Sequence, residues 1–256
     1  MDSRWFEVCT PQRDIDVKFR LFCFPYAGAG ASMFQSWAGW LPPEVELVGI
    51  QLPGRETRLE EPPVRSMEEV MEGIAADIPP LLDRPYGIFG HSTGALSAFE
   101  LARVLRNRGL PEAKLLMISG QNGPKAKRER VRHNLPDDEF IEVMRRVRAM
   151  PDELLQSPEL LEFLLPRIRA DGSVYENYKY DLQKPLDCRI ALFYGLDDEL
   201  VNPEGLAHWN SETTGGVHCY DGFPGGHIFL HKAEADLAKL VNHELAPLIR
   251  QPASVN

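Results

Sequence analysis

The stretch that decides the fold is Tyr86–Ala95, with the sequence YGIFGHSTGA. Its first four residues form an apolar run that is typical of a buried strand, and Gly90-x-Ser92-x-Gly94 follows directly. Beyond it, the apolar residues of Ala95–Arg108 recur at helical spacing. A Gly-x-Ser-x-Gly turn between a strand and a helix is typical of a nucleophile elbow, which lifts the serine hydroxyl off the end of a sheet.

The two glycines of this turn have a steric reason. A serine on so sharp a turn has strained φ and ψ angles, and a side chain at Gly90 or Gly94 would collide with the neighbouring strand or helix. The helix N-terminus behind the serine stabilises developing negative charge. The five-residue pattern alone also occurs in ordinary glycine loops, so the prediction of a nucleophile elbow depends on the strand and the helix that flank it.

Composition limits the classes of protein. The chain has 256 residues, 43% of them hydrophobic, which is enough for one large α/β domain with a substantial core. A formal net charge of −10 disfavours a nucleic-acid partner. No stretch approaches the ~18–20 apolar residues of a membrane span, and the first residues lack the apolar core of a signal peptide. We therefore expect a cytoplasmic protein that does not bind membranes.

Neither the cysteines nor the early glycines predict a cofactor. No cysteine pair is spaced as Cys-x-x-Cys, and Cys23, Cys188 and Cys219 lie in or beside apolar strand-like runs, so we expect buried free thiols. The Gly-x-Gly at 28–30 would need a third glycine at position 33 to bind a dinucleotide, and Met33 stands there. We expect no metal and no bound cofactor.

Strand-like and helix-like stretches alternate along most of the chain. After an irregular segment over 1–19, Ser32 is expected to cap one helix, and Ser66 with Glu69 to form the capping box of another. The expected strands span 21–24, 46–51, 86–89, 113–119, 189–194 and 217–220. The expected helices span 32–37, 66–82, 95–108, 204–211 and 232–249.

The alternation stops between 124 and 185. This insertion holds helical patterns at Asp137–Arg148 and Pro158–Tyr180 and no strand-like run. Helices inserted here would cover the carboxyl ends of the strands, where open α/β sheets bind ligands. We predict a helical lid within a single α/β-hydrolase domain that spans 1–256. The alternative is that the insertion is a fixed part of the fold, which packs on the domain and does not control access to the site.

The serine needs a base, and the base needs an orienting acid. In α/β-hydrolases the chain order is Ser, then Asp or Glu, then His. Asp198 follows a predicted strand and fits the spacing Gly-x-x-Asp-x-x-Val, with its neighbour Asp197 left open as the alternative. His227 follows the glycine-rich stretch 222–226 before the last helix. Both loops can deliver their side chains to the rim that carries Ser92.

The remaining site predictions concern the oxyanion and two other histidines. The N–H of Thr93, after the nucleophile, and the N–H of Ala27, in a loop of small residues, are the expected oxyanion donors. His91 is expected to point away from the nucleophile. The pair His227 and His231 could suggest a metal site, but no glutamate lies between them and no cysteine cluster accompanies them.

Four motifs together resemble those of type II thioesterases, the free-standing enzymes found beside polyketide synthases and non-ribosomal peptide synthetases. They lie in the same order across nearly the whole chain, at Phe24–Gly28, Gln51–Glu56, Gly90–Ala95 and Gly225–Leu230. The chain departs from the family's pattern at two positions. Thr93 stands where methionine is common, and because this position contributes its backbone N–H, we expect the change to alter the shape of the pocket more than its chemistry. Ala29 stands where a second glycine is common, a mild change that leaves the loop small.

The resemblance implies a reaction and a partner. An acyl or peptidyl carrier protein would present an acyl group as a thioester on its own phosphopantetheine. Ser92 would attack the thioester, His227 would take the proton, and Asp198 would hold the imidazole. The family's role is to strip stalled or wrong acyl groups from carrier domains, and some members release intermediates or products. We expect a monomer that needs no cofactor of its own.

Three other interpretations remain open. A carboxylesterase or lipase of the same fold would carry the same elbow and triad. A catalytically inactive binding protein of the hydrolase fold would fail to react with a fluorophosphonate probe. An excised terminal thioesterase domain that cyclises products is disfavoured by the start at Met1 and by the lack of a carrier-domain serine motif before the fold.

A cluster of basic residues precedes the first helix of the insertion. Carrier domains tend to be acidic, and the net charge of this chain would repel them, so a local basic patch would resolve the conflict. The alternative is a solvated helix face, which Glu129 within the run supports. The candidate docking residues are Lys125, Lys127, Arg128, Arg130 and Arg132.

Overall fold

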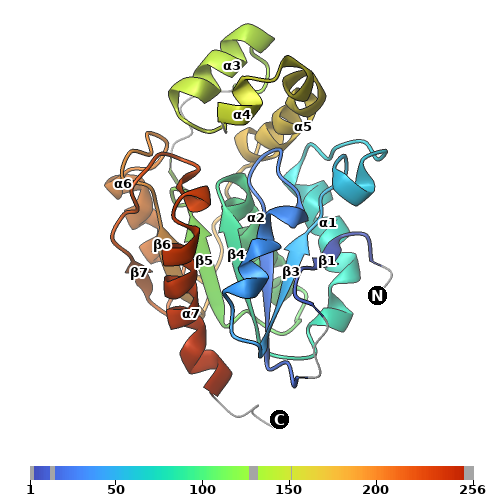
Figure 1. Cartoon of the computed structure of the whole chain (residues 1–256). Helices are drawn as coiled ribbons and strands as arrows, with labels where there is room; N and C mark the ends of the chain where they lie inside the picture. The colour runs from blue at the N-terminus through green and yellow to red at the C-terminus, as the bar shows by residue number, and fades with distance from the viewer. Residues whose placement is uncertain (1–2, 12–14, 127–131, 151, 251–256) are drawn as a thin grey trace.

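A computed structural model describes residues 3–11, 15–126, 132–150 and 152–250. In these ranges seven strands form one sheet in the order β1-β3-β2-β4-β5-β6-β7. Only β1 and β3 are antiparallel, and every other neighbouring pair is parallel. Helices lie on both faces of the sheet (Figure 1). This architecture confirms the predicted α/β-hydrolase fold.

The elements follow one another along the chain much as predicted. The strands are β1 (Phe6–Val8), β2 (Phe19–Phe24), β3 (Val45–Ile50), β4 (Tyr86–His91), β5 (Leu115–Ser119), β6 (Arg189–Phe193) and β7 (Val217–Cys219). The α-helices are α1 (Met67–Asp77), α2 (Thr93–Asn107), α3 (Asp137–Arg146), α4 (Asp152–Leu155), α5 (Pro158–Glu176), α6 (Pro203–Ala207) and α7 (Glu234–Arg250).

Successive side chains of the central strands enter two different cores. In β2, Phe22 and Phe24 pack into the core that contains α1 and α2, whereas Leu21 and Cys23 pack into the core that contains α7. Side chains of a strand alternate between the two faces of a sheet. Because both faces are covered, the parallel strands are apolar throughout, and this is why they were visible in the sequence.

Two predictions for the N-terminal part are wrong. Residues 1–19 contain a strand, β1, in which Phe6 lies opposite Ile50 of β3. Three residues are too few to show an alternating pattern. Ser32 does not cap a helix, because it lies inside a short 3-10 helix whose N-cap is Gly30. Its hydroxyl instead donates a 2.5 Å hydrogen bond to the carboxylate of Glu56.

Other differences are small and have local causes. The capping box of Ser66 and Glu69 is confirmed, but α1 ends at Asp77, because two prolines follow and form a 3-10 turn, Pro79–Leu81. The cysteines are free thiols. Cys23 and Cys188 are buried as predicted, whereas Cys219 is exposed, because β7 is an edge strand of the sheet.

The insertion between β5 and β6 forms α3, α4 and α5, which lie together at one end of the sheet (Figure 1). A third, smaller apolar cluster holds α3 and α5 together through Phe140, Leu165 and Ile168. Two of these helices start where the sequence predicted and end two and four residues earlier, at Arg146 and Glu176, whereas the four-residue α4 was not predicted. Their action as a lid stays a prediction. Among the described helices, none combines the length and apolarity that crossing a bilayer requires.

Candidate active site

Ser92 occupies the sharp turn between β4 and α2. Its backbone has φ 56° and ψ −122°, a conformation that is strained for a residue with a side chain. A Cβ atom added at Gly90 would lie 2.3 Å from the carbonyl oxygen of Gly94. One added at Gly94 would lie 2.3 Å from the carbonyl oxygen of Pro25. The steric reason predicted for both glycines is therefore confirmed.

The side chains of Ser92, His227 and Asp198 form one hydrogen-bonded chain. His227 Nε2 lies 2.7 Å from Ser92 Oγ, and His227 Nδ1 lies 2.8 Å from Asp198 Oδ2. A carboxylate accepts hydrogen bonds, so Nδ1 carries the proton and Nε2 is left as the acceptor for the serine hydroxyl. The side chains of His227 and Asp198 are 5% and 0% exposed, so their contact lies out of reach of bulk water, whereas Ser92 is half-buried and faces the cavity.

The structure places the two neighbouring aspartates differently. Asp198 points inward and also accepts the N–H of Leu200 at 2.9 Å. The side chain of Asp197 is 62% exposed and faces Arg148 at 3.7 Å. The Asp197 N–H donates to the carbonyl oxygen of Gly225, which ties the loop of the acid to the loop of the histidine. The geometry thus favours Asp198 as the partner of His227.

Two backbone N–H groups beside Ser92 are available to a ligand. Thr93 is the first residue of α2, and the first N–H groups of a helix have no acceptor within it. In the loop after β2, the N–H groups of Gly28 and Ala29 are already engaged, by Asp171 and by the Tyr26 carbonyl oxygen. Among the described residues, no hydrogen bond is formed by the Ala27 N–H. Both predicted oxyanion donors line the same cavity as Ser92.

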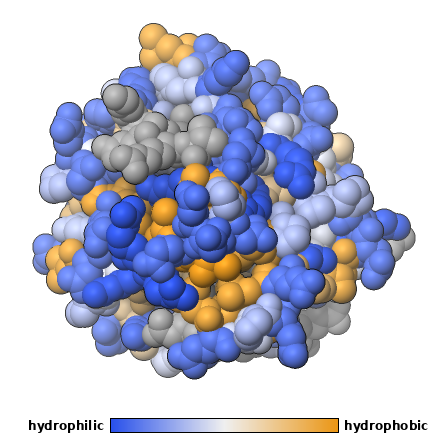
Figure 2. All heavy atoms as spheres, turned by 90° about the horizontal axis from the view of Figure 1, so that it is seen from above, coloured by the Kyte–Doolittle hydropathy of each residue, from blue (hydrophilic) through white to orange (hydrophobic). Residues whose placement is uncertain are grey.

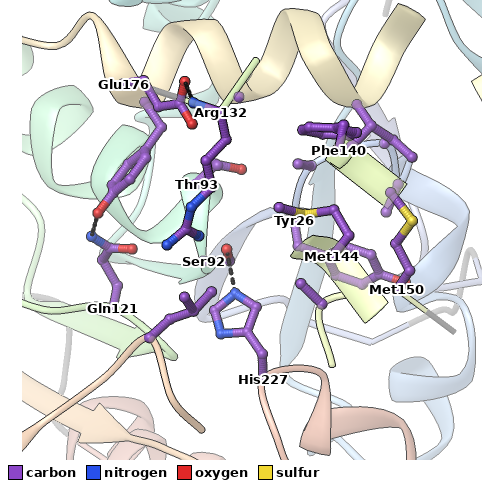
Figure 3. Close-up of a pocket in the computed structure, with 18 of the residues that line it drawn as sticks. Tyr26, Ser92, Thr93, Gln121, Arg132, Phe140, Met144, Met150, Glu176 and His227 are labelled. Atoms are coloured by element: carbon purple, nitrogen blue, oxygen red, sulfur yellow. Dashed lines mark hydrogen bonds between the residues drawn. The ribbon is translucent and has the colours of Figure 1, made fainter. Parts of the chain in front are cut away.

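That cavity has a volume of about 530 Å³ and two different walls. Figure 3 shows Ser92 and His227 between them. On one side Figure 3 shows Phe140, Met144 and Met150 of the insertion, and Leu154, Leu164 and Ile168 are further apolar residues of the insertion that line the cavity. On the other side it shows Gln121, Arg132 and Glu176, and Asn122 and Tyr175 are further polar residues that line the cavity. A cavity of this size and lining fits a small organic ligand that has an apolar and a polar part.

Residues 19–245 match the family profile described as thioesterase domain. The chain belongs to the thioesterase family. It is 39% identical over 233 residues, 90% of each chain, to the gramicidin S biosynthesis protein GrsT of Aneurinibacillus migulanus. This confirms the resemblance drawn from the four motifs.

Two solved structures are similar to this thioesterase. RedJ, a thioesterase from the prodiginine biosynthetic pathway in Streptomyces coelicolor, is 37% identical with a TM-score of 0.83, over 89% of this chain and 85% of RedJ. BorB, a type II thioesterase from the borrelidin biosynthetic cluster, is 28% identical with a TM-score of 0.85, over 98% of this chain and 100% of BorB.

His91 has a place in this thioesterase that the sequence did not reveal. Its Nε2 lies 2.9 Å from the carbonyl oxygen of His227, and its Nδ1 lies 2.8 Å from Ser119 Oγ. A carbonyl oxygen only accepts, so Nε2 carries the proton and Nδ1 accepts from the serine. The ring is fully buried, and that burial holds the pKa of His91 well below its ordinary value. A neutral imidazole thus fixes the backbone of His227.

The other candidate metal ligand, His231, bonds a phenol. Its Nε2 lies 2.8 Å from the hydroxyl of Tyr26, whose pKa is raised to about 12 by burial, so the phenol stays protonated. Among the described residues of the thioesterase, no group of three or more His, Cys, Asp or Glu side chains is arranged to hold a metal ion.

The surface above the inserted helices mixes apolar and polar areas. Figure 2 looks onto this end of the thioesterase and shows an apolar area near the middle of the face, with polar side chains around it. Of the predicted basic patch, residues 127–131 lie outside the described part of the chain. Lys125 forms a 3.1 Å ion pair with Glu212, and Arg132 lines the cavity.

Proposed function

We propose that the protein is a type II thioesterase that hydrolyses acyl thioesters carried on the phosphopantetheine of acyl or peptidyl carrier proteins. The observation that carries the proposal is the 2.7 Å contact between Ser92 Oγ and His227 Nε2, at the base of a cavity with one apolar wall. The similar proteins add the context, since GrsT and RedJ are both named for the biosynthesis of peptide or prodiginine products.

In the first half of the proposed reaction, the acyl group moves to the enzyme. Ser92 Oγ attacks the thioester carbonyl carbon while His227 Nε2 takes the hydroxyl proton. The carbonyl oxygen becomes an oxyanion that accepts the N–H groups of Ala27 and Thr93. The carbon–sulfur bond then breaks, and His227 gives its proton to the departing phosphopantetheine sulfur. The products are an acyl ester of Ser92 and a carrier with a free thiol.

In the second half, water releases the acid. His227 takes a proton from a water molecule whose oxygen attacks the ester carbonyl, and the same two N–H groups hold the new oxyanion. The bond to Ser92 Oγ breaks, and His227 returns the proton to that oxygen. Throughout, Asp198 holds the imidazole in the required tautomer and stabilises the imidazolium that forms. No bound cofactor takes part in the proposed cycle, because the substrate brings its own phosphopantetheine.

The proposal is tested by comparing two substrate types. Purified protein is given a panel of acyl groups loaded on carrier proteins, and, in parallel, p-nitrophenyl esters with the same acyl chains. We expect kcat/KM to be at least ten times higher for the carrier thioesters. Equal or better hydrolysis of the simple esters would identify a carboxylesterase of the same fold. Absence of turnover together with absence of fluorophosphonate labelling at Ser92 would identify a binding protein.

The proposed partner is a carrier protein in the cytoplasm, and the basic segment before α3 is its proposed docking site. Charges at the rim of an interface act mainly on association and are screened by salt. Reversing Lys127 and Arg128 to Glu should therefore lower kcat/KM for acyl carriers several-fold at low salt, and less at high salt. Hydrolysis of a short acyl thiol, which needs no docking, should not change. Equal losses on both substrates would contradict docking at this segment.

A further inference from the structure

The motif Gln51–Glu56 takes no part in the proposed chemistry, yet it contains a charged side chain that is almost completely buried. Arg55 forms a two-pronged ion pair with Asp171 of α5, at 2.6 Å from Nη1 to Oδ2 and 2.8 Å from Nη2 to Oδ1. The two side chains are 4% and 3% exposed. A buried ion pair is weak evidence for stability alone, because desolvation offsets the attraction. Its presence therefore points to a role other than stability.

Both members of this pair also bond the loop that carries a predicted oxyanion donor. Asp171 Oδ2 accepts the N–H of Gly28 at 2.7 Å. Arg55 Nη1 donates to the carbonyl oxygen of Ala29 at 3.1 Å. The pair thus holds one N–H and one carbonyl of the loop that begins at Tyr26, immediately on the C-terminal side of the Ala27 N–H.

The rest of the motif fixes the start of the 3-10 helix Ala31–Phe34, which follows this loop directly. Gln51 Oε1 accepts the N–H of Ala31 at 2.8 Å, and its Nε2 donates to the carbonyl oxygen of Arg55 at 2.8 Å. Glu56 accepts the N–H of Ser32 at 3.2 Å. Three side chains of one motif therefore hold backbone groups of the oxyanion loop and of the helix that follows it, while the Ala27 N–H is left for a ligand.

Helix α5 presses on the loop beside these bonds. Gly28 has φ +83°, and a Cβ atom added there would lie 2.5 Å from Cγ1 of Ile168. Ile168 precedes Asp171 by three residues, so the two side chains lie on the same face of α5. The loop is thus held between the motif and the helix, with no room for movement toward α5.

We propose that Arg55 and Asp171 are positioning residues that hold the Ala27 N–H in its oxyanion-binding place. The inference rests on the proposed serine chemistry. An oxyanion donor acts only if it lies about 2.7–3.1 Å from the developing charge. Asp171 belongs to the inserted helices, so those helices complete the reaction centre as well as covering it. Loss of the pair should leave substrate binding intact and weaken the transition state.

The decisive variant is the double substitution Arg55→Met with Asp171→Leu. Apolar replacements of a buried ion pair often keep a protein folded, and this replacement removes both bonds to the loop. Asp171→Asn is the conservative variant, because its amide oxygen can still accept the Gly28 N–H. The matched control is Arg20→Met. The side chain of Arg20 is 5% exposed and pairs with Glu46 and Asp83, but Arg20 lies at the opposite end of β2 from the oxyanion loop.

The readouts separate positioning from a general loss of structure. For a short acyl thioester, we expect the double variant to lose about 10²-fold in kcat with KM within three-fold of wild type, since a lost oxyanion donor costs 10²–10³-fold. Asp171→Asn should retain at least ten times the kcat of the double variant, and Arg20→Met should retain wild-type kcat among its folded molecules. Affinity for an alkyl trifluoromethyl ketone, which forms an oxyanion on the serine, should fall in parallel with kcat/KM. Affinity for the matching alkyl amide should not change.

The outcomes are distinguishable. If the folded double variant keeps wild-type kcat and wild-type affinity for the trifluoromethyl ketone, the positioning role is wrong. If the double variant does not fold, Asp171→Leu and Asp171→Asn decide the question by the same two measurements. A wild-type protein that neither reacts with a fluorophosphonate nor hydrolyses thioesters overturns the proposed function and the positioning role together. A wild-type protein that reacts, with variants that react equally fast, overturns the positioning role alone.

Discussion

The reaction centre and the helices that cover it are built in different ways. Ser92, His227 and Asp198 stand on loops at the strand ends, and buried hydrogen bonds fix both their side chains and the backbone of His227. The insertion that contains α3–α5 meets the cavity mainly with apolar side chains, including Met144 of α3 and Met150, which lies between α3 and α4. Methionine adapts its shape to irregular surfaces. The molecule is therefore rigid where bonds are made and adaptable where the acyl chain would lie.

The same contrast appears on the outer side of the cover. On α5, Phe163 is 44% exposed, and the ion pair of Arg169 with Asp137 involves a carboxylate that is 75% exposed. Solvated ion pairs of this kind contribute little to stability, about 0–1 kcal/mol each. Segments with few buried contacts open more easily than the core of a fold. The pair of Arg55 with Asp171 differs from these, because both side chains are buried and the pair lies against the reaction centre.

The largest expected effect on kcat comes from substitutions of the nucleophile and its base in the rigid reaction centre. Ser92→Ala and, separately, His227→Ala should each lower kcat for thioester hydrolysis by about 10⁴-fold or more, because the two groups act as a unit in the transition state. The melting temperature should stay within a few degrees of wild type. Steady-state kinetics and thermal melts check both. Residual activity within ten-fold of wild type in either folded variant would contradict the roles given to these residues.

A slightly smaller effect separates the two aspartates. Asp198→Ala should lower kcat by about 10³–10⁴-fold, because the imidazole loses the partner that holds its tautomer. Asp197→Ala is the matched control and should change kcat by less than about three-fold, since its side chain is solvated. The ratio of the two kcat values shows how far the requirement for an acid is confined to the buried Asp198 and not shared by its solvated neighbour. A more damaging Asp197→Ala, with both variants folded, would reverse the assignment of the acid.

The third effect concerns pH and the buried His91. Its pKa in the folded protein lies well below its ordinary value of about 6.5, because burial disfavours the charged ring. The unfolded chain therefore binds the proton more readily, so stability is present above pH 6.5 and is lost as the pH falls below it. The loss from this one group approaches about 1.4 kcal/mol per pH unit.

Urea unfolding of wild type and His91→Phe at pH 7.5, 6 and 5 measures that loss. The phenylalanine variant should be less stable at pH 7.5, because the carbonyl of His227 loses its donor, and its stability should depend less on pH. Wild type and variant curves that run parallel from pH 7.5 to 5 would show that His91 does not titrate differently in the folded protein.

The smallest effect tests the adaptable wall. Met144→Ala should enlarge the cavity and shift the preference among acyl thioesters toward longer chains, by about ten-fold in relative kcat/KM for each pair of methylene groups. The kcat for the best substrate should stay within a few-fold of wild type, because no reacting group is moved. Competition assays with mixed acyl chains measure the shift. An unchanged chain-length profile would place the acyl group elsewhere in the cavity.

Much of the reaction centre could be predicted because its signals are local. Ser92, Asp198 and His227 each follow a strand or a glycine-rich loop, so their places at one end of the sheet can be inferred from short stretches. The choice of Asp198 over Asp197 depended on spacing, and the geometry agrees with it. The β1 strand gave no such signal, because three residues cannot show a period.

The supports of the site could not be predicted in the same way, because they are long-range. Asp171 meets Arg55 across 116 residues, and His91 meets the carbonyl of His227 across 136. A weak signal existed for the first pair. Asp171 lies on the apolar stripe of α5 with Ile168 and Val174. A buried acidic side chain needs a charged or hydrogen-bonding partner, so its position predicts that one is present.

The order of Ser92, Asp198 and His227 along the chain has a consequence during translation of the protein. Ser92 lies in the first half of the chain, whereas its base follows 135 residues later, after the inserted helices and two more strands. A ribosome therefore exposes the serine long before the imidazole exists, and during that interval the hydroxyl is an ordinary alcohol. The nascent chain therefore lacks the proposed serine-dependent hydrolysis until its last part has folded against its first.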